Sequence, residues 1–190
     1  MTISPLELFA AVITLLSIWL ATKENIWYYP TGLVALVLYT WLFYEAKLYA
    51  ESVLQIVCFG LMLYGWYEWL YGGTRKTELP VMNTPRWAWI AGVISGLIGS
   101  AIVIWIQLTY TDNPAPYVDS SLLVWSLVAQ WMTARKWLQN WLLWLIINTV
   151  SVPLYMWREL WLTAGLYIGL WILAITGYRD WRRSMAAVSA

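Results

Sequence analysis

The feature that most constrains this chain is a series of seven uncharged, apolar stretches separated by short clusters of charge. They cover residues 8–22, 25–44, 52–67, 87–111, 120–134, 137–157 and 160–178. A helix needs about 17 to 25 mostly apolar residues to cross the hydrocarbon core of a bilayer, and a charge at the end of a shorter stretch can reach the headgroups. Only 11% of the residues are charged, whereas soluble domains carry about 25%. The sequence therefore predicts an all-α integral membrane protein with seven transmembrane helices.

The basic residues are distributed unevenly between the two sides of such a bundle. If the helices alternate in direction, only Lys47 and Arg158 fall on the side of the N-terminus. Nine others fall on the side of the C-terminus: Lys23, Arg75, Lys76, Arg86, Arg135, Lys136, Arg179, Arg182 and Arg183. Because Lys and Arg are enriched in cytoplasmic loops, we expect an outside N-terminus and a cytoplasmic C-terminus.

The sequence also resembles itself when it is shifted, without gaps, so that residue 19 falls on residue 131. We call this shift the repeat offset. It superposes the first three predicted helices on the last three and leaves the fourth unpaired. Among the aligned pairs are Trp19 with Trp131, Lys23 with Arg135, Gly65 with Gly177, Glu68 with Asp180 and Trp69 with Trp181.

The repeat divides the chain into three parts. We expect a single transmembrane domain over 1–190, with repeat 1 at about 4–73, a linker helix at about 86–111 and repeat 2 at about 119–181. Because the linker is a single helix, the two repeats run parallel. Parallel repeats are a transporter architecture that holds the substrate between its halves near the midplane.

The residue inventory argues against an enzyme. The chain has no His, no metal-ligand cluster, no nucleophile beside a base and no phosphate-binding glycine loop. We therefore expect no catalytic residue, no metal, no cofactor and no nucleic-acid partner. Every Asp and Glu lies at or near the end of a stretch, whereas a proton-coupled transporter typically needs an ionisable group in mid-membrane. The pattern favours facilitated diffusion.

The sixth stretch contains the clearest candidate for a ligand site. Trp141, Trp144 and Asn148 are spaced by three and four residues, which places them on one face of a helix. The depth of these residues within an apolar stretch and their common face favour a ligand site over a purely structural role. We expect these three side chains to face the interior of the bundle.

Further amides and rings lie in neighbouring stretches. Gln55 and Gln130 are either additional ligand contacts or hydrogen-bonding groups that join two helices. Tyr39, Trp41 and Tyr64 supply amphipathic rings that could line the same site.

Other residues have a structural interpretation. Tryptophans near the ends of stretches, such as Trp87, are expected to be interfacial anchors. Pro30 and Pro153 are expected to kink their helices.

Two motifs resemble those of a known family. The stretch 47–69, KLYAESVLQIVCFGLMLYGWYEW, resembles a pattern of LYA, LQ and YGWY.W, and the stretch 133–148, TARKWLQNWLLWLIIN, resembles T.RK...NWLLW.IIN. Both patterns are those of the PnuC family of vitamin transporters, and the similarity extends over about residues 23–181.

This resemblance implies a seven-helix fold of parallel three-helix repeats, similar to the SWEET sugar carriers and commonly a homotrimer. It implies facilitated uptake of an unphosphorylated vitamin through the bacterial inner membrane, followed by trapping by a separate cytosolic kinase. In the family the WxxW...N residues contact the ligand, and here they are Trp141, Trp144 and Asn148. Our leading hypothesis is nicotinamide riboside. Thiamine and riboflavin remain alternatives, and a non-transporting, substrate-binding membrane subunit is the alternative class.

Overall fold

In the computed structural model, which describes residues 5–45 and 49–188, the chain is built of α-helices. The described residues form seven of them: α1 (Pro5–Thr22), α2 (Tyr28–Glu45), α3 (Tyr49–Tyr71), α4 (Arg86–Tyr110), α5 (Pro116–Ala134), α6 (Asn140–Trp157) and α7 (Trp161–Val188). A short 3-10 helix, η1 (Thr74–Lys76), follows α3. Each predicted stretch thus forms one helix, and the predicted number and order are confirmed.

Within the residues that the structure describes, three helices, α1, α4 and α7, are long and apolar enough to cross a membrane on length and composition alone. The remaining four have 18 to 23 residues, but they are rich in Tyr and Trp, which lower the average hydropathy of a helix. Large apolar side chains are open on the outside of the bundle, with Ile90, Leu97 and Trp105 all at least 60% exposed. A surface of this kind suits lipid rather than water.

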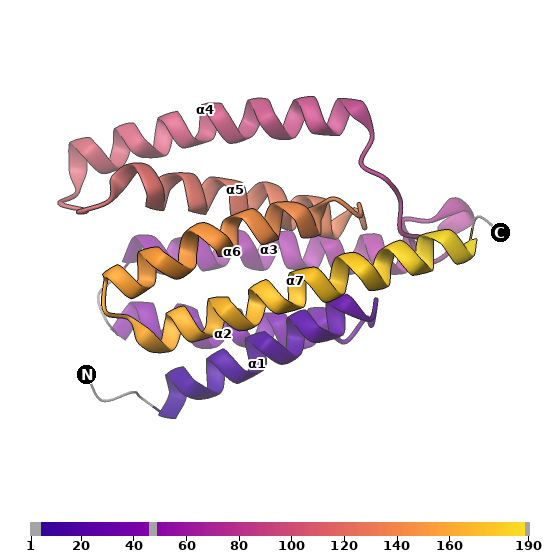
Figure 1. The fold of residues 1–190 in the computed structure, drawn as a ribbon, viewed down its shortest axis with the longest axis horizontal. Helices are drawn as coiled ribbons and strands as arrows, with labels where there is room; N and C mark the ends of the chain where they lie inside the picture. The colour runs from indigo at the N-terminus through magenta and orange to yellow at the C-terminus, as the bar shows by residue number, and fades with distance from the viewer. Residues whose placement is uncertain (1–4, 46–48, 189–190) are drawn as a thin grey trace.

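Six of the helices form a closed ring. Along it α1 packs on α2, α2 on α3, α3 on α5, α5 on α6, α6 on α7, and α7 returns to α1. Within the described part of the chain α4 packs on α5 only, and it lies along one side of the molecule (Figure 1). Small residues allow this approach, because a Cβ at Gly96 would lie 2.8 Å from the Trp125 ring and one at Gly99 would lie 2.9 Å from Val124. The α4 helix, which lies between the triplets α1–α3 and α5–α7 in the sequence, therefore packs outside the ring.

The two ends of the bundle differ in charge. We call basic end the end formed by the α1–α2 turn, the α3–α4 segment, the α5–α6 turn and the end of α7, where the C-terminus lies (Figure 1). The nine basic residues grouped by the sequence lie in these segments. Arg158 lies at the opposite end, in the α6–α7 turn, where its Nη2 is 2.5 Å from Asp119 Oδ2. Lys47, the other cation expected there, lies outside the described residues.

Two predicted boundaries were wrong. The α6 helix begins at Asn140 rather than at 137, because the preceding turn places Lys136 in the left-handed region at φ 48°. The α7 helix continues to Val188, well beyond the predicted end at 178, since charged residues end an apolar stretch without ending a helix. Pro30 lies in the first turn of α2, where a missing N–H breaks no intrahelical bond, so the expected kink has no cause there.

Candidate functional site

The inner face of α6 carries the three residues expected there. Trp141 is 3% exposed and Asn148 is 2% exposed, while Trp144 is partly buried against the same core. Their spacing of three and four residues places them one above the other along the helix. The structure thus turns this face toward the protein rather than toward lipid.

The indole of Trp144 is held by a hydroxyl on the neighbouring helix. Its Nε1 donates to Thr133 Oγ1 at 3.1 Å. The Thr133 hydroxyl donates in turn to Asn140 Oδ1 at 3.0 Å, and Asn140 Nδ2 donates to the Trp137 carbonyl at 2.7 Å. The sequence motif that contains Thr133 and Asn140 predicted no role for either residue. They lie on opposite sides of a turn, so helical spacing could not bring them together.

The Trp141 ring lies nearer the basic end and fills a place left open by a glycine. A Cβ at Gly177 would lie 2.5 Å from this ring, so the close approach of α6 and α7 requires the missing side chain. The Trp181 ring meets Trp141 edge to face, at 5.3 Å between centroids and 85° between planes. Beside these rings, a cavity of about 120 Å³ is lined by Trp141, Leu142, Leu145, Ala174, Ile175, Tyr178 and Arg179.

Two polar atoms on this face lack a hydrogen-bond partner among the described residues. They are Trp141 Nε1, a donor, and Asn148 Oδ1, an acceptor. A buried polar group without a partner costs about 1–3 kcal/mol. The face therefore presents one free donor and one free acceptor beside aromatic rings, which suits a planar ligand with a polar edge.

The predicted amides have different surroundings. Gln130 on α5 donates from Nε2 to the Tyr28 hydroxyl of α2 and to Met62 Sδ of α3, both at 3.0 Å. It therefore joins three helices, which favours the interhelical alternative. Gln55 on α3 and Tyr39 on α2 are both half-buried.

Trp41 and Tyr64 lie at the surface of the bundle. Trp41 is 56% exposed on α2. The Tyr64 hydroxyl accepts a hydrogen bond from Arg135 Nη1 at 3.2 Å, and the same nitrogen lies 3.1 Å from Glu68 Oε2. Burial lowers the pKa of Arg135, but the bond to Tyr64 and the Glu68 carboxylate raise it by more, so the guanidinium stays charged. The structure does not bring these two rings to the buried face of α6, because residue type does not indicate which way a side chain points.

Contacts at the basic end come in pairs. Lys23 Nζ lies 2.7 Å from Asp180 Oδ2, and Arg135 Nη1 lies 3.1 Å from Glu68 Oε2. The repeat offset aligns Lys23 with Arg135 and Glu68 with Asp180. Each bond joins one helix triplet to the other.

Two indole hydrogen bonds are also related by the repeat offset. Trp69 Nε1 donates to the Thr133 carbonyl at 3.1 Å, and Trp181 Nε1 donates to the Ala21 carbonyl at 2.9 Å. The repeat offset again aligns the two donors with each other and the two acceptors with each other.

A third ion pair joins two residues that the repeat offset aligns with each other. Lys136 Nζ lies 3.1 Å from Glu24 Oε2. Both residues have left-handed backbones, with φ of 48° and 53°. Lys136 is 5% exposed, and its ammonium also lies 4.6 Å from the centre of the Trp69 ring.

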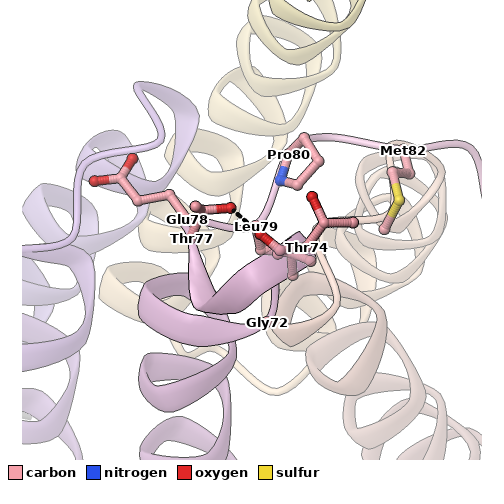
Figure 2. A pocket seen from close by; sticks show the side chains of 8 residues that line it. Gly72, Thr74, Thr77, Glu78, Leu79, Pro80 and Met82 are labelled. Carbon is pink, nitrogen blue, oxygen red and sulfur yellow. Dashed lines mark hydrogen bonds between the residues drawn. The ribbon is translucent and has the colours of Figure 1, made fainter.

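A larger cavity, of about 340 Å³, lies outside the helix bundle in the segment that leads from α3 to α4. Figure 2 shows its lining, which consists of Gly72, Gly73, Thr74, Thr77, Glu78, Leu79, Pro80 and Met82. It contains none of the predicted site residues, and among the described side chains that line it Glu78 is the charged one. We therefore place the candidate site on α6, where the polar atoms are buried.

A comparison with protein families matches residues 4–183 to the nicotinamide mononucleotide transporter family. The chain belongs to this family. Among its relatives, the nicotinamide riboside transporter PnuC of Escherichia coli (strain K12) is 29% identical over 211 aligned residues, covering 96% of this chain and 87% of the relative. The riboflavin/roseoflavin transporter RibM of Streptomyces davaonensis is 24% identical, covering 92% of this chain and 83% of the relative. A crystal structure of the vitamin B3 transporter PnuC superposes with a TM-score of 0.73 at 23% identity, covering 94% of this chain and 80% of that one.

Membership of the nicotinamide mononucleotide transporter family confirms the resemblance to PnuC proteins. The relatives are transporters rather than enzymes, as the residue inventory predicted. The superposition shows that the all-helical fold is shared. Together with the apolar helices, family membership indicates an inner-membrane protein.

Proposed function

We propose that this chain carries an unphosphorylated vitamin, nicotinamide riboside in the first place, across the inner membrane by facilitated diffusion. The observation that carries the proposal is the pair of unpartnered atoms on α6, Trp141 Nε1 and Asn148 Oδ1. Two helical turns separate the two residues along α6, so different groups of one ligand would meet them: a carboxamide N–H suits Asn148 Oδ1, and a ribose oxygen suits Trp141 Nε1. The relative from Escherichia coli, which is named for nicotinamide riboside, supports this choice of substrate.

The aromatic neighbours suit a cationic heterocycle. A positive ring lying over an indole gains about 0.5–2 kcal/mol, more as the site is desolvated. Trp141 and Trp144 supply two such faces on one helix. In this proposal they pack on the pyridinium ring while Asn148 binds its polar edge.

Riboflavin is the second candidate. The match to RibM supports it, and the imide edge of a flavin also carries adjacent donors and acceptors. Flavin and nicotinamide differ in ring size and charge, so direct competition distinguishes them.

Phosphorylated vitamins should be rejected. A phosphate dianion in a buried site needs a cationic partner, and the α6 face offers only indoles and an amide. Arg179 lines the cavity beside Trp141 at the basic end, away from Asn148 in the middle of α6.

The architecture that we propose has seven transmembrane helices in two parallel repeats, 4–73 and 119–181, with 86–111 as the linker. The paired contacts that the repeat offset relates support it, since a two-fold relation between the triplets produces such pairs. Transport would be a rocking of one repeat against the other. On the positive-inside rule the basic end is cytoplasmic and the N-terminus is outside. The homotrimer and the trapping kinase stay predictions.

Uptake by purified protein in liposomes tests the proposal. Radiolabelled nicotinamide riboside should equilibrate without ATP or an ion gradient, and nicotinamide mononucleotide should not enter. Trp144→Ala should weaken uptake strongly, whereas Trp87→Ala, at a side chain that is 59% exposed, should not. Binding without uptake would favour the substrate-binding subunit, and stronger competition by riboflavin or thiamine would change the assigned vitamin.

A further inference from the structure

Thr133 occupies a junction of several hydrogen bonds at the end of α5. Its hydroxyl accepts from Trp144 Nε1 at 3.1 Å and donates to Asn140 Oδ1 at 3.0 Å. Its carbonyl accepts from Trp69 Nε1 at 3.1 Å. Thr133 is 3% exposed, so water does not replace these partners.

We propose that Thr133 is a positioning residue for transport, whose hydroxyl sets the orientation of the Trp144 ring toward the vitamin. The inference rests on the proposed function, in which Trp144 packs on the ligand. Thr133 itself acts through Trp144 and needs no contact with the vitamin.

The direction of the hydrogen bonds gives the hydroxyl this role. Asn140 is fully buried, and its amide nitrogen is engaged by the Trp137 carbonyl at 2.7 Å. Its oxygen therefore faces the Thr133 hydroxyl, whose single proton is shared between this oxygen at 3.0 Å and the Ala129 carbonyl at 2.9 Å. The lone pairs of Thr133 Oγ1 are then available to the indole N–H of Trp144. An indole has one N–H, so a single fixed acceptor decides which way the ring turns.

The triplet α1–α3 shows that this hydroxyl is not needed for the contacts that join the two triplets. The repeat offset aligns Ala21 with Thr133, and the Ala21 carbonyl accepts from Trp181 just as that of Thr133 accepts from Trp69. Ala21 has no hydroxyl, and the residue aligned with Trp144 is Gly32. The backbone bond occurs in both halves, whereas the bond between the Thr133 hydroxyl and the Trp144 indole has no counterpart at Ala21 and Gly32.

Calorimetric titration of nicotinamide riboside into purified variants tests the role. Thr133→Val keeps the shape and the carbonyl but removes the acceptor, and we expect about tenfold weaker binding. Thr133→Ser keeps the hydroxyl and should restore the affinity. The matched control is Thr22→Val, because Thr22 is 1% exposed and its hydroxyl donates to the Trp19 carbonyl at 2.7 Å, away from α6. Its affinity should equal that of the parent.

A double-mutant cycle separates positioning from general packing. Trp144→Phe keeps an aromatic ring but has no N–H, so Thr133→Val should add less than about twofold in that background. An equal penalty in both backgrounds would overturn the inference. If Trp144→Ala leaves binding unchanged, the proposed function fails. If Trp144→Ala weakens binding while Thr133→Val has no effect, the proposed function survives and only the positioning role is lost.

Discussion

The triplet α1–α3 and the triplet α5–α7 share a set of contacts at the basic end, which we call the frame. In both, an indole near the end of the third helix donates to a carbonyl at the end of the first helix of the other triplet. In both, an aromatic residue near the start of the second helix lies over a glycine: Tyr29 over Gly65, and Trp141 over Gly177. These contacts close the basic end in the same way on both sides.

The polar residues of the candidate site are not shared. The repeat offset aligns Trp144 and Asn148 of α6 with Gly32 and Leu36 of α2. A ligand that is not symmetric binds in one orientation, so it needs its polar partners on one side only. The comparison teaches that the frame and the site are separable. Both triplets build the frame, whereas only the triplet α5–α7 carries the proposed site.

The largest effect on the free energy of unfolding should come from breaking the ion pair between Lys136 and Glu24. Lys136→Ala leaves the Glu24 carboxylate, whose side chain is 23% exposed, without its partner, and breaking a largely buried pair costs about 3 kcal/mol. Chemical unfolding in detergent measures this loss. Lys23→Ala, whose side chain is 51% exposed, is the control and should cost less than about 1 kcal/mol. Equal losses of stability would mean that the pair Lys136–Glu24 contributes no more than the exposed pair Lys23–Asp180.

The second prediction concerns the site. Asn148→Ala removes the free acceptor, and we expect about thirtyfold weaker binding of nicotinamide riboside, or about 2 kcal/mol. Its counterpart Leu36→Ala removes a partly buried apolar side chain and should lower stability without changing affinity by more than about twofold. Calorimetric titration gives both affinities. A similar affinity loss at Leu36 would contradict a one-sided site.

The third prediction uses the two glycines. A Cβ at Gly177 would meet the Trp141 ring at 2.5 Å, and one at Gly65 would meet the Tyr29 hydroxyl at 2.6 Å. Each Gly→Ala change should lower the free energy of unfolding by about 1.5 kcal/mol through overpacking. Only Gly177→Ala should also weaken vitamin binding, since only Trp141 belongs to the proposed site. An affinity loss in both variants would place the ligand between the triplets in a more symmetric way.

The smallest effect tests the shared frame itself. Trp69→Phe and Trp181→Phe each remove one buried N–H that donates to a carbonyl, and each should cost about 1 kcal/mol of stability. The two losses, measured by unfolding in the same detergent, should agree within about 0.5 kcal/mol. A clear difference would show that the two contacts are not equivalent.

Much of the fold could be predicted because a bilayer limits the choices. Uncharged stretches must become helices where the backbone has no water to bond, and all seven did. The boundary at Val188 was missed since the end of an apolar stretch marks the end of a membrane span, while the helix continues through charged residues.

Part of the site could also be predicted, since helical spacing places Trp141, Trp144 and Asn148 on one face, and that face is buried. Trp41 and Tyr64 were grouped with them on residue type alone, and the structure leaves both at the surface. The role of Thr133 was missed because its partners lie across a turn and on another helix.

The sequence by itself determined the helices, their order, the grouping of the basic residues and the repeat offset, because these depend on local apolarity and on spacing along the chain. Only the tertiary structure decided which helices adjoin, which indole meets which carbonyl, and which buried polar atoms stay without a partner. The physical reason is that hydrogen bonds and ring contacts depend on distances between helices, and these are set by packing at residues such as Gly177 rather than by the pattern within any one helix.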